Sequence, residues 1–278
     1  MSAAAAPRIL IRVSAPSTES SAAPYAGLHH GFVLADKPSG LGSAGLVGRL
    51  KKELSRQQFP VRGRRLRVGH TGTLDRFASG LMVLLVGKGT ALADQFLHAD
   101  KAYLARFSLG RFTDTHDPEG AVVAEREPDA ARKLLQTESG RERIVQSLQA
   151  ICDRGRQRPP VYSALKQDGR RFSDRARAGE IRLPEERAIT VYDLRLRDVD
   201  PRAATIDFEI HVSGGTYIRS LARDLSEALD FPLHLGALRR FRLGEQRIAA
   251  DCPYPEGARR FDPSVWSPLF YSDAYADD

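Results

Sequence analysis

The chain is organised around residues Gly69–Asp75, GHTGTLD, because they bring one carboxylate to the end of a glycine-containing polar turn. Gly69 and Gly72 allow backbone conformations and close approaches that a side chain would forbid, so a bulky ligand can lie against a tight turn. The apolar run that follows, Ser79–Gly87, is bounded by glycines and has the length of a buried strand. We therefore expect Asp75 at the edge of a rigid element, although an aspartate beside glycine and threonine often only caps a helix or closes a turn.

Composition and charge favour a folded protein that binds a polyanion. The 278 residues are 42% hydrophobic and carry a formal net charge of +7 at pH 7. A basic balance of this kind favours nucleic acid as the partner. The two cysteines, Cys152 and Cys252, show neither CxxC spacing nor a histidine cluster, so we expect no metal site and no disulfide framework, and a reducing compartment fits best. No run reaches the roughly 18 apolar residues of a membrane span, so no membrane association is expected.

The string Gly69–Asp75, followed by Ala78-Ser79-Gly80-Leu81, resembles the catalytic motif of the TruB family of pseudouridine synthases. In that family the aspartate of the motif is the catalytic nucleophile, which the resemblance assigns to Asp75. The histidine of the motif helps to rearrange the target base and corresponds to His70, whose alternative role is that of a turn histidine bonded to the main chain. The family usually has proline after the aspartate, whereas this chain has Arg76, so the loop is expected to be less rigid.

Two motifs nearer the ends of predicted strands also resemble the family. Gly31–Gly40 resembles the first motif of the family, in which a Lys-Pro pair supports the catalytic loop, so Lys37 is expected to be structural or to lie near the RNA. The Lys-x-Tyr sequence at Lys101–Tyr103 resembles the motif that supplies the active-site tyrosine, which places Tyr103 against the target base. A tyrosine on a strand is otherwise a packing residue with a solvated hydroxyl.

The C-terminal half adds three further candidates. Val212–Leu225 reads as a glycine turn that opens an amphipathic helix, and its GTYIR string resembles the family motif that supplies a pocket aromatic, Tyr217, and the arginine paired with the catalytic aspartate, Arg219. An adjacent guanidinium keeps a buried carboxylate charged and fixes its direction. The closing motif of the family is similar to residues 236–244, which makes Leu238 a pocket wall.

The segment Arg111–Gly120 resembles the family as well. Its acidic residues could chelate a cation, but Asx-turn chemistry together with the resemblance favours a structured loop facing the RNA. Asp117 is the secondary site candidate in this loop.

Hydrophobic periodicity predicts the elements between these motifs. They are a strand from Gly31, a helix over Ser43–Leu54, a helix over Thr90–Ala99, a strand over Lys101–Gly110, helical segments over 129–151 broken near Gly140, and paired strands over Ile189–Val199 and Ala204–Val212. The resemblance implies an α+β pseudouridine synthase fold, a curved, mixed but mainly antiparallel sheet flanked by helices.

Four regions are expected around and within the catalytic domain, which we predict to span residues 29–250. Residues 1–28 are small, poor in acids and interrupted by prolines, which favours a disordered extension, with an organellar transit peptide as the alternative. Residues 155–187 are basic and glycine-rich, and the resemblance makes them a mobile arm that closes over RNA. Arg62, Arg64, Arg65 and Arg67 precede the Asp75 turn and suit phosphate contacts. Residues 251–278 form a short tail without a complete C-terminal RNA-binding domain.

Together these features predict a stand-alone, monomeric, cytoplasmic enzyme that converts uridine to pseudouridine in the T loop of tRNA, at position 55. No cofactor, metal or obligatory protein partner is expected. The sequence leaves three mechanisms open, in which Asp75 attacks C1′, Asp75 adds to C6, or a proton leaves C2′ to give a glycal. The rival functions are a guide-RNA-dependent synthase of the dyskerin type, a non-catalytic RNA-binding or RNA-folding protein, and a glycoside hydrolase, which usually needs a second acid.

Overall fold

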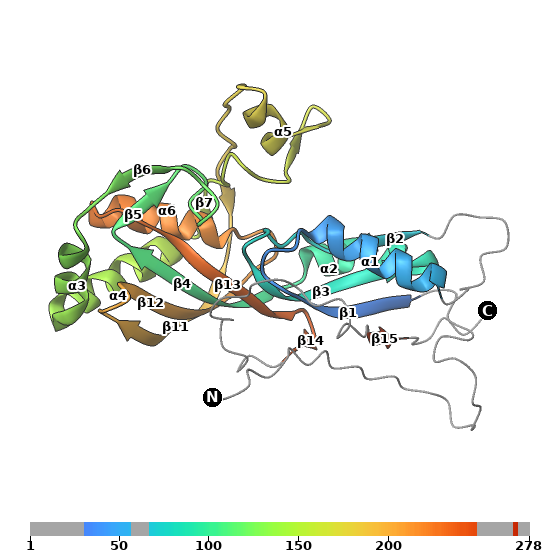
Figure 1. Cartoon of the computed structure of the whole chain (residues 1–278), viewed down its shortest axis with the longest axis horizontal. Coiled ribbons are helices and arrows are strands. Elements are labelled where there is room, and N and C mark those ends of the chain that lie inside the picture. Colours follow the sequence, from blue (N-terminus) through green and yellow to red (C-terminus); the bar gives the residue numbers. More distant parts are fainter. Residues whose placement is uncertain (1–30, 57–66, 249–268, 272–278) are drawn as a thin grey trace. The chain divides into compact units, whose positions relative to one another are not determined.

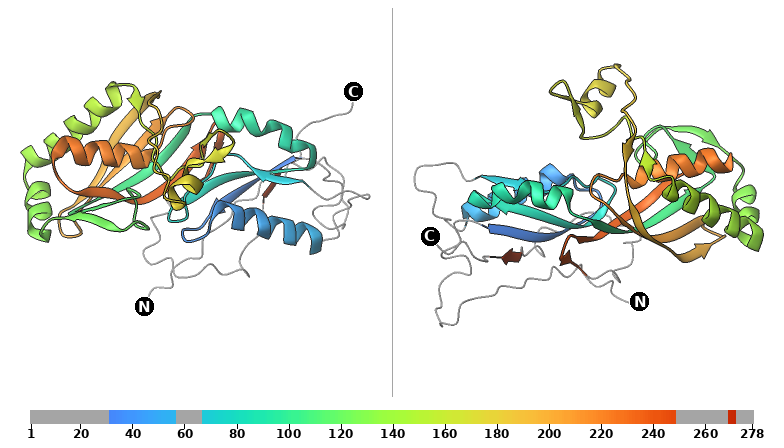
Figure 2. Two further views of the ribbon diagram at one scale, coloured as in Figure 1. Left: turned by 90° about the horizontal axis from the view of Figure 1, so that it is seen from above. Right: turned by 180° about the vertical axis from the view of Figure 1, so that it is seen from behind.

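The computed structural model describes residues 31–56, 67–248 and 269–271, which fall into two compact units. The first unit contains the described residues up to Ala99 and from Phe241 onward, and the second contains Asp100–Arg240. Figure 1 and Figure 2 show the elements of each unit. The extension expected at 1–28, three arginines expected to contact phosphates (Arg62, Arg64 and Arg65) and most of the tail lie outside the described residues.

The first unit is an antiparallel sheet with helices. Its elements are β1 (Gly31–Lys37), α1 (Ser43–Arg56), β2 (Val68–His70), β3 (Ser79–Val86), the 3₁₀ helix η1 (Gly87–Leu92), α2 (Ala93–His98), β14 (Gln246–Arg247) and β15 (Leu269–Tyr271). Strand β3 pairs with β2 and β1, and β1 pairs with β15. The predicted strand at 79–87 and helix at 43–54 are confirmed, whereas the helix predicted over Thr90–Ala99 begins with a 3₁₀ turn.

Strand β3 forms the centre of this unit. All eight of its residues are buried, which explains why its sequence, SGLMVLLV, is continuously apolar rather than alternating. Leu81, Val83 and Leu85 share one face and pack with Leu34 of β1, and Phe96 of α2 packs against the same cluster. The strand that follows the Asp75 loop is therefore anchored along its whole length.

The second unit combines a four-stranded sheet with helices and the arm. Its elements are β4 (Lys101–Leu109), β5 (Arg111–Thr113), β6 (Val122–Glu125), α3 (Pro128–Gln136), α4 (Glu138–Asp153), β7 (Arg156–Gln157), β8 (Lys166–Gln167), β9 (Arg170–Arg171), α5 (Phe172–Arg177), β10 (Arg187–Ala188), β11 (Val191–Asp200), β12 (Thr205–Val212), α6 (Ile218–Leu229) and β13 (Leu233–Leu243), whose last three residues belong to the first unit. The sheet runs in the order β11, β12, β4, β13. The predicted pairing of the strands near 189–199 and 204–212 is confirmed as an antiparallel pair.

Helix α6 supplies much of the apolar surface of this unit. Its buried residues include Ile218, Leu221, Leu225 and Leu229, which recur at helical spacing on one face. Helix α4 packs against α6, and the rings of Phe107 and Phe208, from neighbouring strands, lie 5.7 Å apart in the core. No helix among the described residues is long and apolar enough to span a bilayer.

The break between α3 and α4 falls at Thr137 rather than at the glycine that suggested it. The Oγ1 atom of Thr137 accepts a hydrogen bond from the N–H of Gly140 (3.1 Å), which caps the start of α4. A Cβ atom on Gly140 would lie 2.0 Å from the carbonyl oxygen of Leu134. Gly140 is therefore required for close packing inside the helix start, not for ending a helix.

The segment expected to form the arm has secondary structure of its own. The short strands β7 and β10 pair at its base, β8 and β9 form a hairpin, and α5 buries Phe172. In Figure 1 the part that carries α5 stands away from the sheet of its unit, on the legs that lead from β7 and to β10. The mobility of this arm stays a prediction.

Two glycine substitutions in the first unit should have opposite effects on stability. A Cβ atom on Gly89 of η1 would lie 2.1 Å from the carbonyl oxygen of Gly31, so Gly89→Ala should lower the free energy of unfolding by about 1–3 kcal/mol. Gly48 of α1 is exposed and has open space around it, so Gly48→Ala should raise the free energy of unfolding by about 0.5–1 kcal/mol. Urea unfolding of both variants measures this, and changes of the same sign would contradict the packing described here.

Candidate functional site

The loop between β2 and β3 carries Asp75 and is fixed on both sides of it. Leu74 is buried and exchanges two hydrogen bonds with the hydroxyl of Ser43: its N–H donates to Oγ (3.0 Å) and its carbonyl accepts from Oγ–H (2.7 Å). On the other side, the N–H of Ala78 donates to the carbonyl of Asp75 (3.2 Å). Gly72 has a φ of +77°, the left-handed conformation that favours glycine. The half-buried carboxylate of Asp75 therefore projects from a defined turn.

Lys37 ties this loop to the end of β1. Its side chain is fully buried, and the three N–H groups of Nζ are shared among four main-chain carbonyls within hydrogen-bond distance, those of Ala78 (2.6 Å), Leu41 (2.7 Å), Pro38 (3.1 Å) and Arg76 (3.4 Å). A buried ammonium group is costly unless it is hydrogen-bonded, and here carbonyl oxygens from two segments surround it. Of the two roles expected for Lys37, this geometry fits structural support of the loop.

Arg76 stands where the resemblance expects proline, and it fixes the loop in another way. Its Nε donates to the carbonyl of Gly40 (3.1 Å), and its own carbonyl accepts from the N–H of Gly40 (2.8 Å). The rigidity that proline would give the loop is therefore supplied here by two hydrogen bonds between Arg76 and Gly40.

His70 is the last residue of β2 and lies directly opposite Leu84 of β3, just before the turn.

In the second unit, Arg219 lies in the first turn of α6 and is almost fully buried, at 4% exposed. Its Nη1 donates to the carbonyl of Thr115 (3.1 Å) and its Nη2 to the carbonyl of Tyr162 (2.9 Å). Nη1 also lies 3.5 Å from Oδ2 of Asp117, whose side chain is equally buried. The guanidinium is thus held from three directions, which fixes its plane.

Asp117 connects this arginine to the loop between β5 and β6. Its Oδ1 accepts hydrogen bonds from Oγ1 of Thr115 (2.6 Å) and from the N–H of Glu119 (3.0 Å), while Oδ2 faces Arg219. This is the Asx-turn chemistry expected for the segment. The structure therefore brings together two of the predicted site residues, Asp117 and Arg219, in one buried ion pair.

Tyr103 lies on β4, is 5% exposed and is hydrogen-bonded to the side chain of Arg240. Arg240 is 1% exposed, and burial lowers its pKa, an effect that the bond to Tyr103 opposes. Leu238 is also buried and lies two residues before Arg240 on β13, so the two share one face of that strand.

Lys101, at the start of β4, has a lowered pKa. Burial and the charge of Arg240 lower the pKa to about 8, although the charge of Asp100 raises it.

Tyr217 is the residue that precedes α6, and it contacts both legs of the arm. The side-chain amide of Gln157 donates to the carbonyl of Tyr217 (2.9 Å) and accepts from its N–H (2.8 Å). The guanidinium carbon of Arg187 lies 5.1 Å from the centre of the tyrosine ring, a cation–π arrangement. Sequence reasoning singled out the tyrosine but neither of the residues that hold it.

His116 is a further polar group of the β5–β6 loop. It has a left-handed φ of 61°, its Nδ1 lies 3.2 Å from the carbonyl of Thr113, and its ring packs against Phe112. Burial, followed by the charge of Arg223, lowers its pKa to about 4. The imidazole is therefore neutral at neutral pH and adds no charge near Arg219.

The predicted site residues divide between the two units. Lys37, His70 and Asp75 belong to the first unit, whereas Tyr103, Asp117, Tyr217, Arg219 and Leu238 belong to the second. The pairing of Asp75 with Arg219 stays a prediction. Arg240 was not predicted from the sequence, although the alternation of side chains along a strand places it on the same face as Leu238. Gln157 and Arg187 were not predicted either, and the local sequence gives no signal for them. Among the described residues, no three His, Cys, Asp or Glu side chains gather closely enough to hold a metal ion.

Comparisons with known proteins identify a family. The model described as "TruB family pseudouridylate synthase (N terminal domain)" matches residues 56–218. The tRNA pseudouridine synthase B of Zymomonas mobilis is 40% identical over 228 residues, which cover 80% of this chain and 70% of that protein. Proteins of the same name from Cupriavidus metallidurans and Leptospira interrogans are 39% and 36% identical, over 78% of this chain and 63% and 66% of their own length.

These matches span about two thirds of the length of the relatives, from 63% to 70%. Among solved structures, a Cbf5–Nop10–Gar1 complex contains a chain with a TM-score of 0.51 and 24% identity, and the match covers 80% of this chain and 51% of that one. At this identity the likeness concerns the fold alone. Together with the family match, it confirms the predicted α+β pseudouridine synthase fold.

Removing the ammonium group of Lys37 should loosen the Asp75 loop. Lys37→Met keeps the length of the side chain but leaves buried carbonyls without their donor, so the free energy of unfolding should fall by about 2–4 kcal/mol. Lys51→Met makes the same change at an exposed position of α1 and should stay within about 0.5 kcal/mol of the unchanged protein. Urea unfolding distinguishes them, and equal stabilities for the two variants would contradict the supporting role of Lys37.

The lowered pKa of His116 predicts a loss of stability in acid. Between about pH 6.5 and pH 4 the unfolded chain binds a proton at this residue that the folded chain does not, so its contribution falls as the pH falls. His116→Asn tolerates the left-handed backbone and cannot titrate. Between pH 7 and pH 4 the free energy of unfolding should therefore fall by up to about 3 kcal/mol more in the unchanged protein than in the variant. Parallel pH dependences in denaturant unfolding would show that His116 is not held neutral.

Proposed function

The chain belongs to the TruB family of pseudouridylate synthases, and from this premise we propose that it isomerises uridine to pseudouridine in tRNA. The observation that carries the proposal is the carboxylate of Asp75 on a loop fixed by Lys37, Ser43 and Gly40, within the stretch that the family model matches. The relatives at 36–40% identity are named tRNA pseudouridine synthases, which supports tRNA as the substrate.

The reaction requires few chemical groups. The bond between N1 and C1′ breaks, the base turns, and a bond forms between C5 and C1′, while C5 loses a proton and N1 gains one. No electrons are exchanged with another molecule, so the chemistry needs an ionised carboxylate and a pocket that stabilises the detached base. We assign the carboxylate to Asp75. Attack at C1′, addition at C6 and proton loss from C2′ are all compatible with that assignment.

The other site residues take supporting roles in this proposal. Arg219, oriented by Asp117 and two carbonyls, balances the charge of the nucleophile. Tyr103 and Tyr217 hold the faces and edges of the extruded base, Leu238 forms an apolar wall, and His70 assists when the base leaves its stack, which costs a few kcal/mol. Each of these roles comes from the resemblance; Tyr103, Arg219 and Leu238 are buried, whereas His70 and Tyr217 are partly exposed.

The substrate contacts are proposed to extend over the arm. Arg170, Arg171, Arg177 and Arg182 are exposed on residues 155–187, and the chain carries a net charge of +7, which suits a phosphate backbone. We propose the T-arm uridine at position 55 as the target and a monomeric, cytoplasmic enzyme that works without a guide RNA or a protein partner. Residues 29–250 then act as one catalytic domain.

A guide-dependent synthase is the second candidate, because the Cbf5–Nop10–Gar1 complex shares the fold. The identity of 24% limits that likeness to the fold, whereas the relatives named tRNA pseudouridine synthase B reach 40%. A stand-alone enzyme is therefore favoured.

The proposed function is tested with the purified chain and an unmodified tRNA transcript. Mapping of pseudouridine should find it at the T-loop uridine without any added guide RNA or protein. Asp75→Asn is nearly isosteric and removes the nucleophile, so the rate should fall by at least about 1000-fold while the Kd for tRNA changes by less than about threefold.

Asp94→Asn is the matched control, since Asp94 is an exposed residue of α2 in the same unit, and its rate should be unchanged. Turnover retained in Asp75→Asn would place the nucleophile elsewhere. A chain that binds tRNA but forms pseudouridine only with a guide RNA would favour the second candidate.

A further inference from the structure

The base of the arm is a two-stranded ribbon whose two facing residues both contact Tyr217. In the β7–β10 pair, Gln157 lies directly opposite Arg187. Residues opposite each other on antiparallel strands have Cβ atoms about 4.5–5.5 Å apart, so they act on the same neighbour. Here Gln157 bonds to the main chain of Tyr217, and Arg187 stacks on its ring.

Gln157 holds the main chain of Tyr217, the residue that precedes α6. Tyr217 precedes the helix in an extended conformation (φ −105°, ψ 114°), and its own side chain makes no capping hydrogen bond. The fully buried carboxamide of Gln157 donates from its NH2 group to the carbonyl of Tyr217 (2.9 Å) and accepts through its oxygen from the N–H of Tyr217 (2.8 Å). The side chain therefore pairs with Tyr217 as a neighbouring strand would, and sets the direction in which the tyrosine leaves the backbone.

Arg187 fixes the ring from the other leg of the arm. Its Nη2 donates to the carbonyl of Gly215, two residues before Tyr217, which holds the guanidinium over the aromatic face. Gly215 has a φ of +85°, a left-handed conformation that favours glycine, and its Cα lies close enough to the guanidinium that an added Cβ atom would be in van der Waals contact with the guanidinium carbon at 3.6 Å. A cation over the face of a tyrosine is attracted by the ring electrons.

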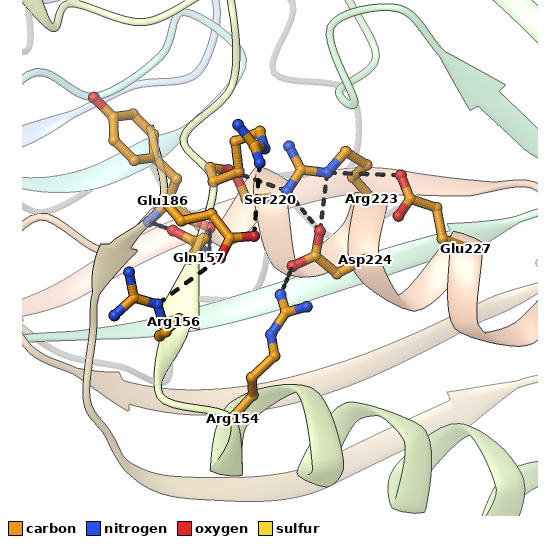
Figure 3. A network of polar contacts seen from close by, with 10 residues as sticks. Arg154, Arg156, Gln157, Glu186, Ser220, Arg223, Asp224 and Glu227 are labelled. Carbon is orange, nitrogen blue, oxygen red and sulfur yellow. Dashed lines mark hydrogen bonds and ion pairs between the residues drawn. The ribbon is translucent and has the colours of Figure 1, made fainter. Parts of the chain in front are cut away.

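Further contacts join the two legs to each other and to α6 (Figure 3). The carbonyl of Arg158 accepts hydrogen bonds from Oγ of Ser220 (2.9 Å) and Nη2 of Arg223 (3.1 Å). The side chain of Arg158 donates to the carbonyl of Pro184 in the other leg (2.9 Å) and forms an ion pair with Glu186. The arm base and the start of α6 are therefore joined by several polar contacts.

From this geometry we propose that Gln157 and Arg187 are positioning residues for Tyr217, which couple the arm that engages RNA to the aromatic ring that holds the target base. The inference rests on the proposed function. Neither residue touches the reacting atoms; they act through the main chain and the ring of Tyr217. The β7–β10 ribbon then determines the position of both the arm and the ring of Tyr217. When the arm binds RNA, the same ribbon positions the ring against the target base.

The test compares near-isosteric variants at both positions. Gln157→Met keeps the packing volume but removes both bonds, and Arg187→Met removes the cation from the ring. For each, the single-turnover rate at saturating tRNA should fall by about 100-fold, the cost of a reacting group displaced by about 1 Å, while the Kd for tRNA changes by less than about threefold. Arg187→Lys keeps a cation and a donor and should recover most of the lost rate.

Matched controls make the same changes at exposed positions of the same unit. Gln149→Met on α4 and Arg132→Met on α3 should leave the rate unchanged. Thermal unfolding confirms that each variant is folded at the assay temperature. An unchanged single-turnover rate in a folded Gln157→Met variant, or a loss that appears only in the Kd, would overturn the proposal.

Hydrogen exchange of residues 216–221 provides a readout that needs no catalysis. The N–H of Tyr217 donates to Gln157, so Gln157→Met should speed exchange in this segment by at least about tenfold, whereas Gln149→Met should not. Equal protection in Gln157→Met and the unchanged protein would overturn the positioning role whatever the activity. If exchange of residues 216–221 is faster in Gln157→Met than in the unchanged protein, but the unchanged protein forms no pseudouridine, the positioning role would stand and the proposed function would be contradicted.

Discussion

The placement of Asp75 depends on one buried ammonium group. Between β2 and β3 the chain makes little regular secondary structure, so no strand ladder determines where the carboxylate points. Lys37 replaces that ladder, because its Nζ donates to the carbonyl of Ala78 in the loop (2.6 Å) and to the carbonyl of Leu41 in the turn after β1 (2.7 Å). A buried cation that donates to main-chain carbonyls has few alternative arrangements, since a movement of the loop leaves a charge or a carbonyl without its bond. The nucleophile of the proposed reaction is therefore set by a residue that takes no part in it.

The second unit follows the same principle with neutral and charged groups. Tyr217 has no side-chain cap of its own and is held by the amide of Gln157, and Arg219 is oriented by two carbonyls and by Asp117. In each case a buried polar side chain bonds to the main chain of a segment distant in sequence. Such contacts fix direction as well as position, which matters for a reaction in which a detached base must turn between two bonds to the same sugar.

Local patterns in the sequence predicted the main helices and strands, but they did not predict the buried side chains that hold the site segments in place. The continuous apolar run of β3 and the helical spacing of α1 and α6 follow from burial on one or both faces, so they can be read directly. The glycine predicted a break near residue 140, and the helices do break at Thr137, but Gly140 itself lies inside α4 and is required by close packing against Leu134. The supporting role of Lys37 was expected from the family motif. Gln157 gave no signal, since its partner lies 60 residues away and a single buried amide has no periodicity.

The most direct measurement is a crystal structure of the Asp75→Asn variant bound to a T-arm RNA. Our account predicts that the target uridine is extruded and that the side chain at position 75 lies within about 3.5 Å of its ribose C1′ or base C6, the separation of a near-attack arrangement. The carbonyls around Lys37 should keep the same hydrogen bonds in the complex. A structure in which the side chain at position 75 points away from the bound nucleoside, with another carboxylate at the sugar, would contradict it.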